Sequence, residues 1–353
     1  MNNPKRIIIF RPGALGDTLV SAPVIWAFRK HFADRKICYL SEEHTKSSTI
    51  QASEVAGLIP EIDETFRYTR TTEWKERLRE LRAKIKPRRE DVLVYLCYQR
   101  TSAIDVLRDW IFFVLVGFRN FAGLGTAFRD AARGQVPDST ETEYARLFRM
   151  AGSLGIQRDQ SAHGTLRTDR EWGAAFWAKH KLNGTAVIVV CPGSKMQSKR
   201  WPAERFTQAI SEISKSVQAA FVVIGDSNDH GIAEYIDQNA NARVISAVGT
   251  TLLQSSTILS RAKLYLGNDT GPMHLAALHG VPCVAIFSSR DRENKWHPWG
   301  SGHAVLRSKI ECSGCLLEEC FTAPSACLAK ISVDSVVRAA AERLVSSRSI
   351  AAL

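Results

Sequence analysis

Short apolar runs alternate with helical patterns along most of the 353-residue chain, and this alternation constrains the fold more than any other feature. Such runs, bounded by Gly, Pro or Asp and separated by helices, are typical of parallel sheets covered by helices on both faces. The runs occupy residues 6–10, 36–40, 62–68 and 91–98, and then 185–193, 219–227, 242–249, 263–269 and 281–288. The early helical patterns cover residues 18–31, 46–56 and 73–86. The chain is therefore predicted to be a doubly wound α/β protein.

The chain is also long for a single hydrophobic core, because a domain typically holds about 100–200 residues. The stretch 161–172 lacks a strong apolar period and separates the two series of runs. We therefore predict two domains, over residues 1–165 and 166–353. Ligands of such sheets bind beyond the carboxyl ends of the strands, so we expect the site in the cleft between the domains.

A glycine turn follows the first apolar run and ends on an acid. Residues 7–17 read IIIFRPGALGD, without the G-x-G-x-x-G spacing of a dinucleotide-binding turn or the Lys-Ser/Thr of a P-loop. Gly13 and Gly16 let the backbone approach a ligand closely, and Gly16 can adopt a positive φ. Asp17 would repel a phosphate. The residues alone leave two interpretations of Asp17 open, a base or a cap for a helix that starts at Thr18.

A polar turn in the second half has the features of an anion site. The turn 268–271 follows a strand-like run, and Pro272 suits the first turn of the next helix. Asp269 or Thr270 is placed to cap this helix. Its free N–H groups, together with His274, favour an anion such as a pyrophosphate. A capped strand–helix turn without a ligand is the alternative.

The chain carries an excess of positive charge, with 47 Lys and Arg against 36 Asp and Glu, a formal net charge of +11. Such a balance fits an anionic partner: nucleic acid, a membrane surface or a phosphorylated substrate. Basic residues are dense in segment 67–90, where one apolar helical stripe is formed by Trp74, Leu78, Leu81 and Ile85. This helix either has a solvated basic face or faces an acidic ligand or anionic lipid head groups.

Two further patterns limit the partners and the location. The sequence has no recognisable nucleic-acid motif and no interleaving of aromatic and basic residues, so nucleic acid is not an expected partner. The longest apolar run, residues 110–118, has about half the length of ~18 residues needed to span a bilayer. No N-terminal segment resembles a secretory signal, and we expect a cytoplasmic protein.

The eight cysteines fall into two groups. Four lie in apolar, strand-like runs and are expected to be buried free thiols: Cys38, Cys97, Cys191 and Cys283. The other four are spaced C-x2-C-x4-C-x6-C, close enough for four thiolates to surround one tetrahedral ion: Cys312, Cys315, Cys320 and Cys327. This spacing matches no standard zinc ribbon or ferredoxin pattern. Free or partly buried thiols are therefore preferred to a structural metal site.

Four segments together resemble glycosyltransferase family 9, the heptosyltransferases. RPGALGDTLVSAPVI at 11–25 and GNDTGPMHLAALHGVPCVAIF at 267–287 are similar to the two signature regions of that family. CPGSKMQSKRWPAERF at 191–206 is similar to the segment in which Lys precedes Trp-Pro and a helix, and CSGCLLEECFTAPSACLAKI at 312–331 to the cysteine-containing tail. The segments follow the family's order and span nearly the whole chain.

The resemblance implies the GT-B architecture, in which two Rossmann-like domains face each other across a cleft. It implies an inverting, metal-independent glycosyltransferase that transfers heptose from ADP-L-glycero-β-D-manno-heptose to the lipopolysaccharide inner core. The nucleotide-sugar would be a co-substrate of the C-terminal domain, and no other cofactor would be required. The N-terminal domain would receive the acceptor.

Other readings of the activity stay open. A family relative could use another donor sugar or a protein acceptor. From a different class, the chain could be a non-enzymatic module that binds nucleotides or nucleic acid. Asp17 argues against such a module, because a phosphate-binding module has no reason to aim a carboxylate at its ligand.

The resemblance also assigns roles to single residues. Asp17 matches the position of the family's catalytic aspartate, and Lys199 matches a ligand of the donor phosphate or sugar. Ser194 lies where some members use hydroxyl groups toward the phosphates, although Lys195 departs from that pattern. Many members place an acid in the loop 222–231 to contact the ribose, and the candidates here are Asp226 and Asp229.

The remaining assignments complete the donor and acceptor sides. The donor diphosphate is expected at the turn and helix start formed by Asp269, Thr270, Gly271 and His274. The basic helix is expected to hold an anionic, membrane-borne acceptor through Arg77, Arg82 and Lys84. The protein would then make peripheral contact with the cytoplasmic face of the inner membrane.

Overall fold

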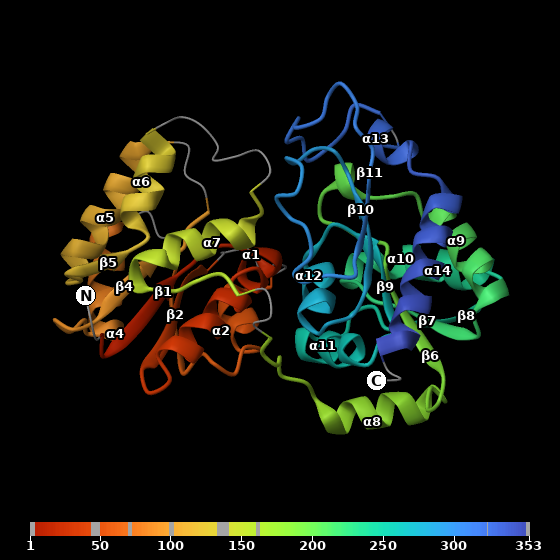
Figure 1. Ribbon diagram of the computed structural model, residues 1–353, viewed down its shortest axis with the longest axis horizontal. Helices are drawn as coiled ribbons and strands as arrows, with labels where there is room; N and C mark the ends of the chain where they lie inside the picture. The colour runs from red at the N-terminus through yellow and green to blue at the C-terminus, as the bar shows by residue number, and fades with distance from the viewer. Residues whose placement is uncertain are drawn as a thin grey trace. The chain divides into compact units, whose positions relative to one another are not determined.

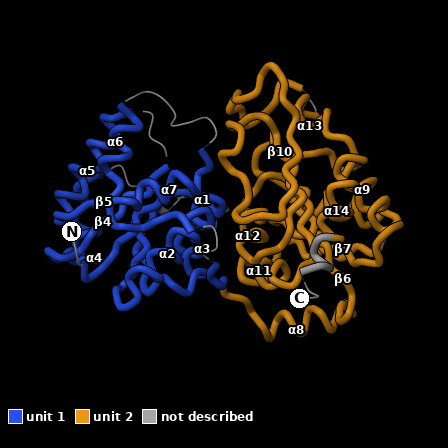
Figure 2. The backbone as a smooth tube through the Cα atoms, viewed as in Figure 1, with its two compact units in different colours: residues 1–166 blue, residues 167–353 orange. Residues whose placement is uncertain are grey.

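The computed structural model describes residues 4–43, 50–69, 73–98, 102–132, 141–159, 163–322 and 324–350. The chain forms two compact units, residues 1–166 and 167–353, drawn in blue and orange in Figure 2. This division lies one residue from the boundary expected from the sequence. Each unit has its own parallel sheet, so the predicted pair of Rossmann-like α/β units is confirmed.

Unit 1 is built on a five-stranded parallel sheet. Its strands, in spatial order, are β3 (Glu64–Thr69), β2 (Lys36–Glu43), β1 (Arg6–Phe10), β4 (Val92–Tyr95) and β5 (Asn120–Ala122). All of β1 is buried, because a central parallel strand is covered on both faces. The apolar pattern does not predict β5, which has only three residues and begins with a polar side chain.

The helices of unit 1 are α1 (Leu15–Leu19), α2 (Ala22–His31), α3 (Ala52–Ala56), α4 (Trp74–Ile85), α5 (Ala103–Val116), α6 (Leu124–Ala132) and α7 (Glu143–Ala151), and a 3-10 turn follows at η1 (Gly152–Leu154). The single helix predicted over 18–31 is in fact α1 and α2. Pro23, near the start of α2, has no N–H with which to continue the hydrogen bonds of α1, so a new helix begins. The second half of the helix predicted over 46–56 corresponds to α3, and residues 44–49 lie outside the described residues. The prediction of α4 is confirmed.

Unit 2 is built on a six-stranded parallel sheet. Its strands, in spatial order, are β11 (Ala304–Arg307), β10 (Cys283–Phe287), β9 (Leu264–Asn268), β6 (Ala186–Cys191), β7 (Ala219–Val223) and β8 (Arg243–Ser246). The five predicted strands of this half are confirmed. The edge strand β11 is missed because it is short and only half-buried, so its apolar signal is weak.

The helices of unit 2 are α8 (Arg170–Lys179), α9 (Ala203–Ser216), α10 (His230–Asn239), α11 (Leu252–Ser260), α12 (Gly271–Leu278), α13 (Ala326–Ala329) and α14 (Val333–Ile350), with 3-10 turns η2 (Gln197–Lys199) and η3 (Ser227–Asp229). Helices α9, α10 and α14 cover one face of the sheet, and α11 and α12 cover the other (Figure 1).

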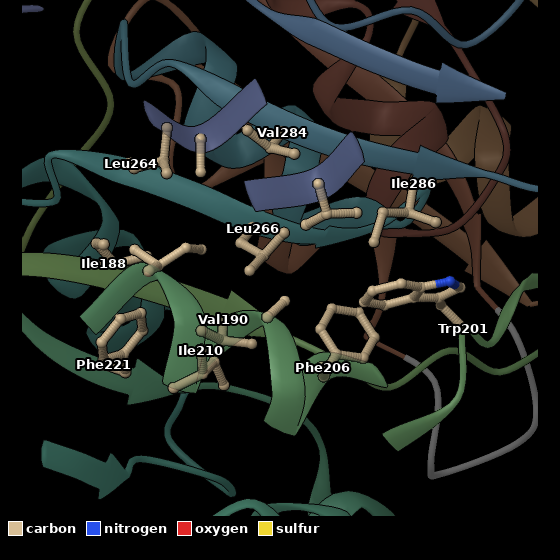
Figure 3. Close-up of a cluster of buried hydrophobic side chains, with 14 of the residues drawn as sticks. Ile188, Val190, Trp201, Phe206, Ile210, Phe221, Leu264, Leu266, Val284 and Ile286 are labelled. Carbon is tan, nitrogen blue, oxygen red and sulfur yellow. The ribbon is translucent and has the colours of Figure 1, made fainter. Parts of the chain in front are cut away.

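The core of unit 2 lies between the sheet and the layer of α9, α10 and α14 (Figure 3). Strand residues such as Ile188 and Leu266 point into it, and Trp201 and Phe206 meet edge to face with ring centroids 4.9 Å apart. Trp201 lies two residues after Lys199, and it is 2% exposed. Its burial therefore fixes the loop that carries Lys199 to the hydrophobic core.

The strand order of each unit reverses beside its first strand, between β1 and β4 in unit 1 and between β6 and β9 in unit 2. The ends of these strands are level, since Phe10 pairs with Tyr95 and Cys191 with Gly267. Such a reversal opens a crevice beyond the carboxyl ends of the strands, where ligands of open α/β sheets bind. Among the described residues no helix is both long enough and apolar enough to cross a bilayer.

Candidate functional site

Asp17 lies beyond the carboxyl end of β1, at the strand-order reversal of unit 1. Helix α1 begins at Leu15 rather than at the expected Thr18, so Asp17 sits in its first turn. Its Oδ2 accepts a hydrogen bond from the Ala14 N–H at 3.2 Å, while the side chain remains 31% exposed. The carboxylate thus closes the helix start and still reaches solvent, so capping and proton transfer do not exclude each other.

Gly13, and not Gly16, has the special backbone of this turn. Gly16, which is able to adopt a positive φ, does not do so because it lies inside α1, whereas Gly13 has φ 142°. A Cβ on Gly13 would also lie only 2.7 Å from Cγ of Asp17. The first glycine therefore makes room for the carboxylate that follows it four residues later.

A Gly13→Ala substitution should displace the Asp17 side chain and strain the turn. We expect a loss of stability of about 1–3 kcal/mol, visible as a lower melting temperature, together with loss of any activity that depends on Asp17. Gly125→Ala in α6 is the matched control, because a Cβ there meets no atom within 4 Å and φ is not in the positive range. Equal melting temperatures in the two variants would contradict the steric role of Gly13.

Arg11, a residue not predicted from the sequence, binds the glycine turn through its buried side chain. Arg11 is fully buried, and it donates from Nε to the Asp17 carbonyl and from Nη1 to the Leu96 carbonyl, both at 2.7 Å. Nη1 also lies 3.0 Å from Oε1 of Glu143, whose carboxylate is shared with Arg146. The signal in the sequence that could have identified Arg11 is a cation placed directly after an apolar, strand-like run.

The remaining nitrogen of Arg11 faces the candidate base. Nη2 has no hydrogen-bond partner, is buried, and lies 3.9 Å from Oδ1 of Asp17. A buried guanidinium at this distance attracts a carboxylate and limits the positions that its side chain can take. We therefore regard Arg11 as a positioning residue for Asp17.

In unit 2, Lys199 forms a buried cluster with two carboxylates at the carboxyl ends of β9 and β10. Its Nζ lies 2.7 Å from Asp269 and 3.3 Å from Asp291, and Arg290 pairs with Asp291 at 2.8 Å. Burial by itself would lower the pKa of Lys199, but Asp269 and Asp291 outweigh it and raise that pKa. Lys199 is therefore charged, and its charge is balanced by carboxylates within unit 2.

Arg290 and Asp291 were not singled out from the sequence. They follow β10, and Arg290 also donates to the carbonyls of Leu316 and Leu317, at 2.6 and 2.7 Å. The pKa of Asp291 is lowered, since Lys199 and Arg290 outweigh the opposing effect of burial. This cluster therefore links the Lys199 loop, the end of β10 and the cysteine-rich segment.

The start of α12 is open, as expected of an anion site. The Thr270 side chain makes no capping bond and instead donates to the Asn268 carbonyl at 3.3 Å, while Asp269 is held by Lys199. Neither expected cap therefore forms, and the first N–H groups of α12 lack a side-chain partner from Thr270. The side chain of Asn268 joins the strand ends by donating to the Pro192 carbonyl at 2.7 Å.

His274, expected to favour an anion together with the N–H groups of α12, carries no positive charge. It is 3% exposed, and burial together with the nearby Lys199 lowers its pKa to about 3. At neutral pH the imidazole is therefore neutral. Its ring meets Trp296 edge to face with centroids 6.4 Å apart.

The two acids of the loop after β7 have different surroundings. Asp226 is exposed, and its Oδ1 accepts from the Asn228 N–H at 2.8 Å. Asp229 is 7% exposed, accepts from the Asp226 N–H at 3.0 Å and would overlap a Cβ placed on Gly193. Burial raises the pKa of Asp229. Asp226 is thus the acid available to a ligand, and Asp229 shapes the loop.

Ser194, the expected hydroxyl ligand, lies just beyond β6 and is half-buried. Its Oγ accepts from the Met196 N–H at 3.2 Å, and Arg200 donates to its carbonyl at 2.7 Å. The structure therefore gathers the ends of β6, β7, β9 and β10 at one edge of the unit 2 sheet, and with them Ser194, Lys199, Asp226, Asp269, Thr270 and Gly271.

The three basic residues expected to bind an acceptor have different surroundings. Arg77 is half-buried, with its guanidinium 5.8 Å from the centroid of the Phe112 ring. Lys84 is exposed and pairs with Glu80 at 2.6 Å, and Arg82 is exposed on α4. The predicted apolar stripe is also shorter than expected, because Trp74 is 48% exposed.

The four clustered cysteines border one small pocket with Ser289 and Arg290. Cys312 and Cys315 are exposed and Cys327 is buried, with its Sγ accepting from the Ser289 N–H at 3.3 Å. Within the described ranges no three His, Cys, Asp or Glu side chains are gathered closely enough to hold a metal ion. The other four cysteines are buried, as predicted.

Comparison with known proteins places this geometry in a family. Residues 143–325 match the family model of glycosyltransferase family 9 (heptosyltransferase). Lipooligosaccharide heptosyltransferase 2 of Campylobacter jejuni is 26% identical over 170 residues, which are 47% of this chain and only 53% of that relative. Lipopolysaccharide heptosyltransferase 3 of Escherichia coli is 20% identical over 302 residues, 81% of this chain and 84% of the relative.

A solved structure extends the likeness along the whole chain. The crystal structure of the family 9 glycosyltransferase from Veillonella parvula is matched with a TM-score of 0.73 at 20% identity, covering 98% of both chains. At this identity the match establishes the shared fold.

Proposed function

We propose that this chain, which belongs to glycosyltransferase family 9, transfers a heptose from ADP-L-glycero-β-D-manno-heptose to the lipopolysaccharide inner core, with inversion at the anomeric carbon. The observation that carries the proposal is the accessible Asp17 carboxylate, held by Arg11 at the strand-order reversal of unit 1. Another donor sugar or a protein acceptor would use the same chemistry and is the alternative.

Asp17 acts as the general base in this proposal. In an inverting transfer the acceptor oxygen attacks the anomeric carbon, its proton passes to a base, and the bond to the nucleotide phosphate breaks. Asp17 has a partly exposed carboxylate to take that proton, and Gly13 and Arg11 restrict where it points. The acceptor hydroxyl would therefore bind at the carboxyl edge of the unit 1 sheet.

Unit 2 holds the nucleotide-sugar in this proposal. The uncapped start of α12 offers N–H groups and the positive end of a helix dipole to the diphosphate. Asp226 accepts from the ribose hydroxyls, and Ser194 faces the phosphates. The buried cluster of Lys199 with Asp269 and Asp291 offers a cation to the departing phosphate and carboxylate oxygens to sugar hydroxyls. These groups are all the protein's own, and none of these contacts requires a metal.

The acceptor is anionic and membrane-borne in this proposal. The exposed Arg82 and Lys84 of α4 and the half-buried Arg77 supply positive charge to the side of unit 1 that would meet it. We further propose that the protein works at the cytoplasmic face of the inner membrane, where such an acceptor is accessible. Nucleic acid has no role in this scheme.

Calorimetric titration with ADP, followed by a panel of nucleotide-sugars, tests the donor site. We expect ADP to bind to the native chain and to bind at least about tenfold more weakly to Gly271→Val, a change of about 1.4 kcal/mol, because the new side chain stands over the open start of α12. Gly125→Val in α6 is the control and should bind ADP normally. Equal ADP affinity in Gly271→Val and the native chain, both folded, would rule out this donor site.

A further inference from the structure

Helix α5 has a large apolar face that no other described element covers. Six of its 14 residues are large apolar side chains with exposed fractions between 41% and 76%: Ile104, Leu107, Trp110, Ile111, Val114 and Leu115. At 3.6 residues per turn these positions fall within an arc of about 140°. The opposite side of the helix buries Val106, Phe113 and Val116. The exposed residues therefore form one continuous stripe, which is more than the scattered apolar exposure normal for a soluble surface.

The stripe continues into a cavity of about 540 Å³ within unit 1. Ile111 and Leu115 of the stripe border the cavity together with Trp74 of α4, and Phe10 and Tyr68 line its interior. Phe10 ends β1 and Tyr68 lies near the end of β3, so the cavity opens at the carboxyl edge of the sheet. This is the edge that also carries Asp17.

Basic side chains flank the apolar stripe. Helix α5 packs against α4 on one side and α6 on the other (Figure 1). Exposed cations on these elements include Lys75, Arg79, Arg82 and Lys84 of α4, Arg108 of α5 and Arg129 of α6. Arg108, 66% exposed, lies on the margin of the stripe and also borders the cavity with Arg77. A helix with an apolar face and cationic margins is suited to the interface of an anionic bilayer.

We propose that the α5 surface, meaning the six exposed apolar residues of α5 with the cavity mouth and these flanking cations, docks onto an anionic lipid bilayer. The apolar stripe enters the boundary between head groups and acyl chains, and the cations contact lipid phosphates. The proposal rests on the proposed function and adds to it the part of unit 1 that meets the membrane. A lipid-borne acceptor docked here would present its head group at the sheet edge that carries Asp17.

Sedimentation with vesicles of phosphatidylethanolamine and phosphatidylglycerol tests the docking. The triple variant Ile104→Gln, Leu107→Gln, Val114→Gln removes half of the stripe without altering the cavity lining. We expect its partition coefficient to be at least about tenfold lower than that of the native chain. The control variant changes three exposed apolar residues of unit 2, Tyr235→Gln, Leu253→Gln and Val345→Gln, and should bind like the native chain. Vesicles of phosphatidylcholine alone, or high salt, should weaken binding by the native chain.

A second measurement does not depend on the folding of the triple variant. Brominated acyl chains should quench the fluorescence of Trp110 in the native chain, and Trp110→Phe should lose part of that quenching. Equal vesicle binding by the native chain and the triple variant, with no difference in quenching, would overturn the proposal. So would a native dimer that the triple variant dissociates, because a second copy would then cover the surface.

The proposed function is checked separately, by transfer to a deacylated, water-soluble acceptor. Failure of the native chain in that assay counts against the proposed function, while the vesicle comparison still decides the docking.

Discussion

Asp17→Asn is expected to lower the rate of sugar transfer by about 10²–10⁴-fold, the usual contribution of a general base. The amide is isosteric with the carboxylate and can still accept the Ala14 N–H, so α1 should remain intact. ADP affinity should not change, because the proposed nucleotide contacts all lie in unit 2. Single-turnover transfer, a melting curve and an ADP titration on the same preparation measure these three quantities.

The control for Asp17→Asn is Asp105→Asn. Asp105 also lies in the first turn of a helix, α5, and pairs with Arg108 at 3.1 Å on the surface. The Asp105→Asn variant should keep both its stability and its turnover, since an exposed ion pair contributes about 0–1 kcal/mol. Near-normal transfer by Asp17→Asn, at an unchanged melting temperature, would refute the base assignment.

The sequence predicted those parts of the fold whose signal is local and repeated. Central strands such as β1 and β9 are buried on both faces and read as unbroken apolar runs. The edge strands β5 and β11 are short and only partly buried, so burial imposed no comparable pattern on them. The break between α1 and α2 depends on Pro23 alone. The apolar period continues across this proline, so the pattern does not reveal the break.

Residues of the candidate site were predicted only where a motif lies within one continuous segment of the sequence. Asp17 and Lys199 were found because each stands in a recognisable stretch. Arg11 and Asp291 acquire their roles through partners that are distant in sequence, Glu143 and Lys199. His274 was expected to favour an anion, but burial lowers its pKa and leaves the imidazole neutral, and burial is a property of the tertiary structure. The sequence thus indicated candidate residues for the site, and the packing determined their charge states.

The buried position of Lys199 also gives the second large effect. Lys199→Met should lower the free energy of unfolding by about 3–5 kcal/mol, because Asp269, 4% exposed, loses its cation. Asp291 keeps Arg290 as a partner, so the uncompensated charge falls on Asp269. Lys215→Met is a matched control. Lys215 also makes a 2.7 Å ion pair, with Glu212, but its side chain is 63% exposed, and its loss should cost no more than about 1 kcal/mol.

The deficit of Lys199→Met should shrink as the pH falls. Burial already raises the pKa of Asp269 in the native chain, and removal of Lys199 takes away the group that opposes this shift. A carboxyl whose pKa is higher in the folded than in the unfolded state stabilises the fold below its unfolded pKa, and that contribution is lost as the pH rises through the folded pKa. Denaturant unfolding at several pH values measures this trend. The double variant Lys199→Met, Asp269→Asn should recover most of the stability and lose the pH dependence, since no unpaired charge is then buried. Equal losses in Lys199→Met and Lys215→Met would mean that the buried pair contributes no more than a surface one.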